Sequence, residues 1–95
     1  MIAAQDAAPH LPGTLVQLGY FAGTLTVASF LPQVIRAWTT RSTRDLSLSS
    51  FALLITASSM WILYGLLSRD WPVVATNSGM VTLTGALAVA KVRYR

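Results

Sequence analysis

The chain has 95 residues, of which 54% are hydrophobic and 11% are charged, and its formal net charge is +4. Soluble domains carry about 25% charged residues, so this composition excludes an ordinary small soluble protein and predicts an all-α protein embedded in a lipid bilayer. The chain has no cysteine, which excludes disulfides, thiolate zinc sites and iron–sulfur clusters. Its basic residues flank apolar runs, which indicates that they orient membrane-spanning segments rather than bind nucleic acid.

Residues 1–13 precede the first apolar run. Asp6 and His10 are the only ionisable side chains in this segment, whereas a secretory signal peptide begins with basic residues. Its proline, glycine and small residues indicate a flexible lead-in rather than a cleaved signal. Residues 14–95 then form one predicted transmembrane domain, without an internal repeat.

Three apolar segments in this domain are each long enough for a helix that crosses a membrane, which takes about 20 residues. They cover about residues 14–38, 47–68 and 71–91. Hydroxyl and carboxylate side chains that can cap a helix stand before the second and third segments. These are Asp45, Ser47 or Ser49 for the second helix and Asp70 for the third. We therefore predict a bundle of three transmembrane helices.

Basic residues cluster at one end of this predicted bundle. They lie around the first connector, as Arg36, Arg41 and Arg44, and after the third segment, as Lys91, Arg93 and Arg95. Residues 1–13 have no Lys or Arg, and the second connector has only Arg69, beside Asp70. Because Lys and Arg favour the cytoplasmic side, we expect the first connector and the C-terminus in the cytoplasm and the N-terminus and the second connector outside. The membrane we expect is the cell membrane, either an inner or a plasma membrane.

The first segment carries a polar face and a helix breaker. The residues that share this face by helical spacing are Ala22, Thr26, Ser29 and Gln33. Pro32 removes a backbone hydrogen bond and should bend the helix near residues 28–29, either as a static kink or as a hinge. Gly19 and Gly23 form a Gly-x-x-x-Gly pattern, which permits close approach of a second helix.

Polar residues also share faces of the second and third segments. These faces comprise Ser58, Trp61, Gly65 and Ser68, with Tyr64 at the margin, and Asn77, Val81, Thr84 and Ala88. Such groups can simply hold helices together by hydrogen bonds, and this alternative stays open for the Ser and Thr residues. Trp61 and Asn77 together favour a polar-substrate site, because an indole packs on the C–H face of a sugar while an amide exchanges hydrogen bonds with its hydroxyls.

No Asp, Glu, Lys, Arg or His lies in the middle of any segment. Proton-coupled carriers usually place an ionisable group there, so its absence favours passive movement of a neutral solute. The sequence has no Gly-rich phosphate loop, catalytic triad or set of metal ligands, and the sole histidine, His10, lies in the lead-in. We therefore expect neither an enzyme nor a bound cofactor or metal.

Taken in order along the chain, these features resemble the bacterial half-size sugar transporters called SemiSWEETs, which belong to the PQ-loop superfamily. The similarity covers about residues 17–92, and it is carried by FLPQVIRAW (30–38), TRSTRDLSLSSF (40–51), MWILYGLLSRDWP (60–72) and Asn77. It implies that the three-helix bundle pairs with a second copy as a parallel homodimer, giving a six-helix transporter. It also implies that the third helix lies between the first and the second.

The resemblance further implies roles for particular residues. Trp61 would stack on the sugar, and Asn77 would hydrogen-bond it at mid-membrane. The polar faces add Ser58, Thr26 and Ser29 to the predicted substrate-binding set. The other implied roles are a hinge at Pro32 and Gln33, an outer gate at Tyr64, Arg69 and Asp70, and an inner gate near Phe51.

The function that follows is passive, bidirectional transport of a mono- or disaccharide by alternating access, in which the inner half of the first helix swings about Pro32. One alternative is a PQ-loop carrier of another small metabolite such as an amino acid, although the uncharged pocket disfavours charged substrates. Another is a structural or assembly membrane protein whose polar faces only hold subunits together. A small multidrug exporter is disfavoured because no membrane-embedded acid is available to bind a cation.

Overall fold

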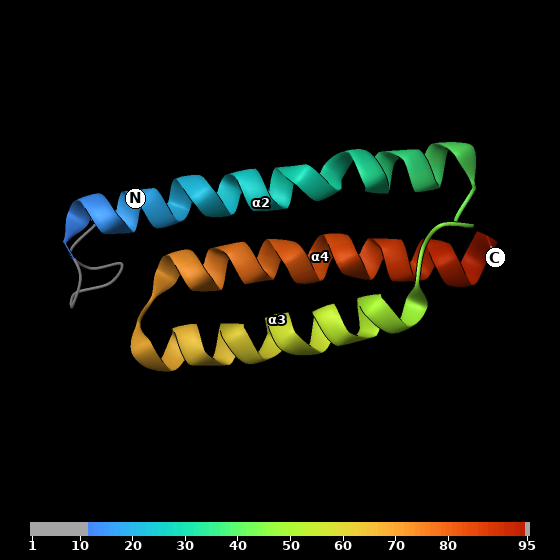
Figure 1. Ribbon diagram of the computed structural model, residues 1–95. Coiled ribbons are helices and arrows are strands. Elements are labelled where there is room, and N and C mark those ends of the chain that lie inside the picture. Colours follow the sequence, from blue (N-terminus) through green and yellow to red (C-terminus); the bar gives the residue numbers. More distant parts are fainter. Residues whose placement is uncertain (1–11, 95) are drawn as a thin grey trace.

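The structure, a computed structural model, describes residues 12–94 as three helices (Figure 1). In the labels of Figure 1, these are α2 (Gly13–Thr40), α3 (Leu48–Ser68) and α4 (Trp71–Tyr94). Each is long and apolar enough to cross a membrane. The predicted all-α fold with three membrane-spanning helices is therefore confirmed.

The observed helix ends lie close to the predicted ones. The N-cap of α3 is Ser47, whose hydroxyl accepts a hydrogen bond from the backbone N–H of Ser50 at 3.3 Å. The carboxylate of Asp70 accepts one from the N–H of Val73 at 3.4 Å, in the first turn of α4. Both caps match the sequence prediction. The proposed flexible lead-in falls almost wholly in residues 1–11, outside the described residues; Gly13 begins α2.

The third of the described helices, α4, is the central helix of the bundle. It packs against both α2 and α3, which flank it on opposite sides (Figure 1). This is the order that the family resemblance implied. The three helices lie side by side along an elongated molecule of 45 × 21 × 18 Å. As a result, the polar faces of α2 and α3 are separated by α4 within one chain.

Buried residues on the helices that flank α4 are separated by seven positions or by twice that number. On α2 and α3 they are Val16, Gly23 and Ala37, and Phe51, Ser58 and Gly65. On α4, Met80 and Leu87 repeat the same spacing. A seven-residue repeat is typical of helices that cross at a small angle in a left-handed supercoil, with interlocking side chains. The contact lines are thus narrow, and the rest of each flanking helix is exposed.

The glycine pair of α2 lies against α4, as its spacing predicted. A Cβ added at Gly19 would lie 3.3 Å from the Cβ of Pro72, and a Cβ added at Gly23 would overlap the hydroxyl of Thr76. Pro72 and Thr76 are four residues apart, as the two glycines are. Glycine is therefore required at Gly23 for α2 to approach α4 this closely.

At the opposite end, aromatic and polar contacts join α2, the first connector and the end of α4. The indole N–H of Trp38 donates to the carbonyl oxygen of Ala86 at 3.2 Å, and the ring of Trp38 meets that of Tyr94 edge-on, with centroids 5.5 Å apart. The ammonium of Lys91 donates to the carbonyl oxygen of Thr43 at 2.8 Å. These contacts span elements far apart in the sequence and hold this end together.

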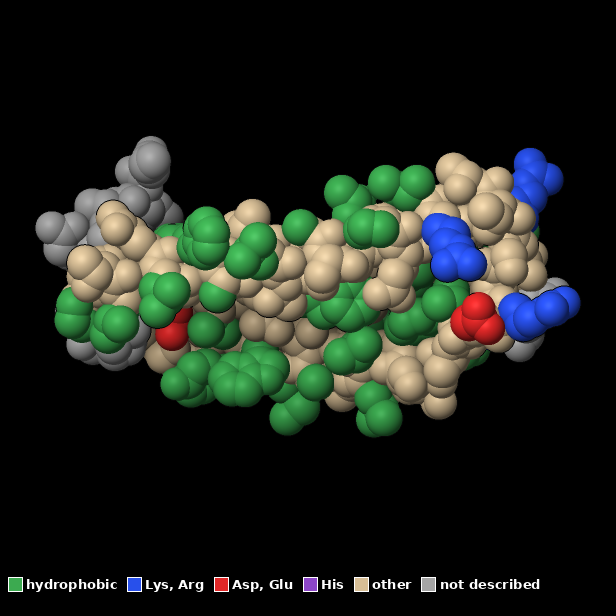
Figure 2. All heavy atoms as spheres, turned by 45° about the horizontal axis from the view of Figure 1, so that its top comes forward, with side chains coloured by type: hydrophobic (Ala, Val, Ile, Leu, Met, Phe, Trp, Pro, Cys, Tyr) green, Lys and Arg blue, Asp and Glu red, His purple; other side chains and the backbone are tan. Residues whose placement is uncertain are grey.

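The same end carries most of the positive charge. Figure 2 shows Lys and Arg side chains gathered where α2 and α4 end. We call this the basic end; its cationic residues in the described range are Arg36, Arg41, Arg44, Lys91 and Arg93. The other end, at the connector between α3 and α4, has Arg69 beside Asp70. The charge asymmetry predicted from the sequence thus maps onto the two ends of the bundle.

Candidate functional site

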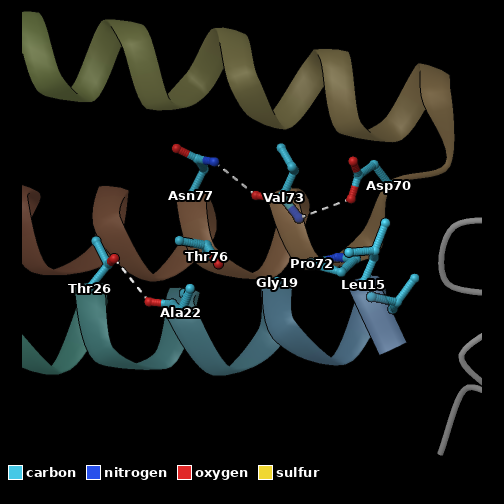
Figure 3. A pocket seen from close by; sticks show the side chains of 11 residues that line it. Leu15, Gly19, Ala22, Thr26, Asp70, Pro72, Val73, Thr76 and Asn77 are labelled. Atoms are coloured by element: carbon cyan, nitrogen blue, oxygen red, sulfur yellow. Dashed lines mark hydrogen bonds between the residues drawn. The ribbon is translucent and has the colours of Figure 1, made fainter. Parts of the chain in front are cut away.

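A groove of about 300 Å³ runs between α2 and α4 in the half of the molecule away from the basic end (Figure 3). Its polar lining is formed by Thr26 from α2, Asp70 before α4, and Thr76 and Asn77 on α4. The glycine pair of α2 contributes to its floor. Polar groups thus converge on one groove beside the closest approach of two helices.

Asn77 presents the amide of this groove. Its side chain is half-buried, and its NH₂ group donates to the carbonyl oxygen of Val73 at 2.9 Å. In Figure 3 the amide oxygen points away from Val73. A side-chain amide offers two N–H donors and one acceptor oxygen, so one donor and the acceptor are left for a ligand hydroxyl.

The hydroxyls of α2 bond back to their own helix. Thr26 donates to the carbonyl oxygen of Ala22 at 3.0 Å, and Ser29 donates to that of Thr26 at 2.6 Å. Both side chains are exposed, but only Thr26 lines the groove. A hydroxyl that donates in this way keeps its oxygen lone pairs as acceptors, so Thr26 can still accept a hydrogen bond from a ligand.

Trp61 lies on α3, apart from the groove that holds Asn77. Its side chain is 52% exposed and meets the ring of Tyr64 edge-on, with centroids 5.5 Å apart. The two rings line a separate open hollow with Ala57 and Met60. Ser58, grouped with Trp61 by spacing, instead faces α4 and is only 5% exposed. One chain therefore does not bring the predicted indole and amide into a single pocket.

The residues expected to form an outer gate lie at the end opposite the basic end. Asp70 lines the groove, and Arg69 is exposed next to it in a left-handed backbone conformation with φ of 58°. Tyr64 is exposed one turn earlier on α3. These three side chains thus lie at the mouth of the bundle, with Asp70 the one that borders the groove.

The residues expected to act as hinge and inner gate lie toward the basic end. The helix α2 continues unbroken through Pro32, and the side chains of Pro32 and Gln33 are exposed. Phe51 is only 6% exposed and belongs to the core, where it joins Ala37 and Leu87. In this conformation Phe51 therefore packs inside one chain.

Sequence reasoning missed Thr76 and Pro72, which form the α4 side of the groove. Both lie opposite the glycine pair of α2, and their four-residue spacing repeats that of the glycines. A matching spacing on the facing helix was the available signal, but it gains meaning only when the neighbouring helix is known. Among the described residues, no group of three or more His, Asp or Glu side chains is placed to hold a metal ion.

Comparisons with known proteins agree with these features. Residues 15–74 match the family model described as PQ loop repeat. The chain is 39% identical over 83 residues to the sugar transporter SemiSWEET of Bradyrhizobium diazoefficiens, covering 87% of this chain and 96% of that protein. It is 41% identical over 66 residues to the sugar transporter SemiSWEET of Leptospira biflexa, covering 70% of this chain and 75% of the relative.

A solved structure shares the same fold. The crystal structure of a bacterial homologue of SWEET transporters superposes with a TM-score of 0.82 at 29% sequence identity. The match covers 86% of this chain and 99% of that one. The arrangement with α4 in the centre is therefore found in an experimentally determined relative.

Proposed function

The chain belongs to the PQ-loop family and, within it, to the SemiSWEETs, and from this premise we propose that it moves sugar passively across a membrane by alternating access. The observation that carries the proposal is the half-buried amide of Asn77 in a groove between two membrane-spanning helices, where Asp70 is the one charged side chain in the lining. An amide donates hydrogen bonds to hydroxyls and accepts hydrogen bonds from them, and it carries no charge with which to pair a charged substrate. The relatives from Bradyrhizobium and Leptospira are both named as sugar transporters.

We propose that Trp61 and Asn77 bind the sugar together. The indole packs on its C–H face, and the amide bonds its hydroxyls. Thr26 adds an acceptor on the opposite wall of the groove. Ser29, exposed one turn further along α2, and Ser58, at the α3–α4 contact, complete the proposed set at its edges.

A second copy of the chain is needed to enclose this site. The groove with Asn77 and the hollow with Trp61 are both open in one chain, whereas ligand sites bury most of a ligand's surface. A parallel homodimer, related by an axis along the membrane normal, brings both copies of each hollow to a shared axis.

We propose that access alternates between two gates. Tyr64, Arg69 and Asp70 close the outer mouth, and the segment of α2 beyond Pro32 swings to open the inner one. The inner gate lies near Phe51, which shares a core cluster with Ala37 of the moving segment. The basic end faces the cytoplasm of the cell's inner membrane, and the N-terminus lies outside. With no ionisable residue at mid-membrane, net flux follows the sugar gradient.

Uptake of labelled glucose and sucrose into liposomes that contain the purified protein tests the proposal. Wild type is expected to take up at least one sugar, and Asn77→Ala should reduce that uptake about tenfold or more, because it removes hydrogen bonds worth about 1.4 kcal/mol or more. Thr82→Ala is the matched control: Thr82 is an exposed α4 residue whose hydroxyl bonds only the carbonyl oxygen of Ser78.

The outcomes separate the site from the function. Equal uptake by Asn77→Ala and wild type would leave transport standing and remove Asn77 from the site. No uptake of either sugar by folded, dimeric protein would contradict sugar transport. Transport of another solute, inhibited by amino acids but not by sugars, would then favour a PQ-loop carrier of another metabolite.

A further inference from the structure

A second hollow, of about 280 Å³, lies at the basic end, between the last turns of α2 and the first connector. Its polar lining consists of Gln33, Arg36, Ser42, Arg44 and Asp45. All of these side chains are exposed. The hollow therefore presents two guanidinium groups, one carboxylate, one amide and one hydroxyl to whatever enters it, a set that the proposed sugar site does not use.

This hollow lies at the level of the lipid headgroups along the membrane normal. The 28 residues of α2 span about 42 Å at ~1.5 Å per residue, close to the full thickness of a bilayer with its headgroup regions. Arg36 lies four residues, or about 6 Å, before the end of the helix at Thr40. It therefore lies where hydrocarbon gives way to phosphate, and the groups most concentrated around it are those of phospholipids.

The hollow carries charges of both signs. Arg36 and Arg44 can bind a phosphate through several N–H donors, while Asp45 can accept hydrogen bonds from a cationic donor. We propose that this hollow binds the headgroup of phosphatidylethanolamine, with its phosphate on the two arginines and its primary ammonium on Asp45. Gln33 and Ser42 supply further polar contacts to the phosphate oxygens.

The chemistry of Asp45 distinguishes this lipid from the other common ones. Phosphatidylcholine has the same phosphate, but its quaternary ammonium has no N–H to donate to a carboxylate. Phosphatidylglycerol has the same phosphate but no cation, so its glycerol hydroxyls would offer Asp45 only neutral hydrogen-bond donors. A purely basic surface would instead prefer phosphatidylglycerol, because anionic lipids are attracted to clusters of Lys and Arg.

Occupancy of the hollow would have a structural effect. One wall comes from α2 immediately after Pro32, and the other comes from the connector that leads into α3. A headgroup that contacts Arg36 and Asp45 at once links these two segments. The bound lipid therefore stabilises the inner end of the bundle, whichever solute the protein carries.

Native mass spectrometry of the purified full chain tests the proposal by titration with phosphatidylethanolamine, phosphatidylcholine and phosphatidylglycerol of identical acyl chains. We expect wild type to bind the ethanolamine lipid about tenfold more tightly than the choline lipid, the effect of one charge-assisted hydrogen bond. Asp45→Asn should remove that preference and leave binding of phosphatidylglycerol undiminished. Arg36→Gln and Arg44→Gln should each weaken binding of all three lipids.

Arg93→Gln is the matched control, because Arg93 belongs to the same basic end but does not line the hollow. It should keep the wild-type preference for ethanolamine over choline. Because Asp45→Asn is expected to bind the ethanolamine lipid more weakly while its binding of phosphatidylglycerol is undiminished, loss of folding cannot imitate the result. Equal binding of the ethanolamine and choline lipids by wild type, or an unchanged preference in Asp45→Asn, would overturn the proposal.

Free phosphoethanolamine distinguishes the two possible sources of this headgroup. It carries the same charged groups without acyl chains, and we expect it not to displace the lipid at equal concentration. Displacement at equal concentration would mean that the hollow takes a soluble compound, which would overturn the assignment to a lipid.

Discussion

The substitution Gly23→Ala tests the close approach of α2 to α4. An added Cβ would overlap the hydroxyl of Thr76 and lie 3.0 Å from the Cβ and 3.3 Å from the Cγ2 of the same residue. Rotating Thr76 does not relieve this crowding, because its Cβ is fixed to the α4 backbone and threonine has few allowed rotamers. The two helices must therefore move apart, and overpacking of this kind typically costs about 1–3 kcal/mol.

Gly85→Ala is the control for this experiment. Alanine favours a helix over glycine by about 1 kcal/mol. Gly23→Ala alone would therefore combine a gain in helix propensity with a loss of packing between α2 and α4. Gly85 also lies inside a helix, α4, and a Cβ added there meets nothing within 4 Å, so Gly85→Ala reports the gain in helix propensity by itself. The difference in unfolding free energy between the two variants should be about 1–3 kcal/mol, with Gly23→Ala the less stable.

Reversible unfolding of both variants in mixed detergent, followed by far-UV circular dichroism, measures this difference. The folded variants should also be compared for oligomeric state, so that a change in assembly is not mistaken for a change in helix packing. Equal stability of Gly23→Ala and Gly85→Ala would refute the inference that the glycine pair sets the separation of α2 and α4.

Three further predictions concern the hinge, the basic end and the topology. Pro32→Ala should slow sugar transport more than it weakens sugar binding, and equal transport rates in mutant and wild type would contradict a hinge role for Pro32. Trp38→Phe removes the indole N–H that bonds the carbonyl oxygen of Ala86 and should lower the free energy of unfolding by about 0.6–1.7 kcal/mol; an unchanged unfolding curve would contradict this. A cysteine placed at Arg69 should react with an impermeant label from outside and one at Arg41 only from inside, and the reverse pattern would overturn the topology.

Helix positions could be predicted from the sequence because their determinants are local. Charged connectors interrupt apolar runs long enough to cross a bilayer. Ser47 and Asp70 cap α3 and α4 through hydrogen bonds to residues three positions ahead. The order of the helices in space is a different matter, since all three segments are similarly apolar. Only resemblance to a known family placed α4 in the centre.

The candidate site could be predicted in part, because spacing defines the face of one helix but not how that face is turned toward its neighbours. Thr26 and Asn77 do line one groove. Ser58 and Trp61 are three residues apart and were assigned to one face, yet Ser58 is 5% exposed and Trp61 52%. The contact line of α3 runs through Ser58 and leaves Trp61 on its flank, and only packing against α4 decides this.

The contacts at the basic end constrain how a hinge at Pro32 could work. Beyond Pro32, α2 is tied to α4 through the bond from Trp38 to the carbonyl oxygen of Ala86 and through the ring of Tyr94. On the other side of Pro32, α2 rests on α4 through Gly23, which has no side chain to interlock. A swing of α2 alone would break the tied contacts, whereas sliding at the glycine contact breaks no hydrogen bond. If α2 bends at Pro32, its inner segment and the end of α4 should therefore move together, with the adjustment taken up at the glycine contact.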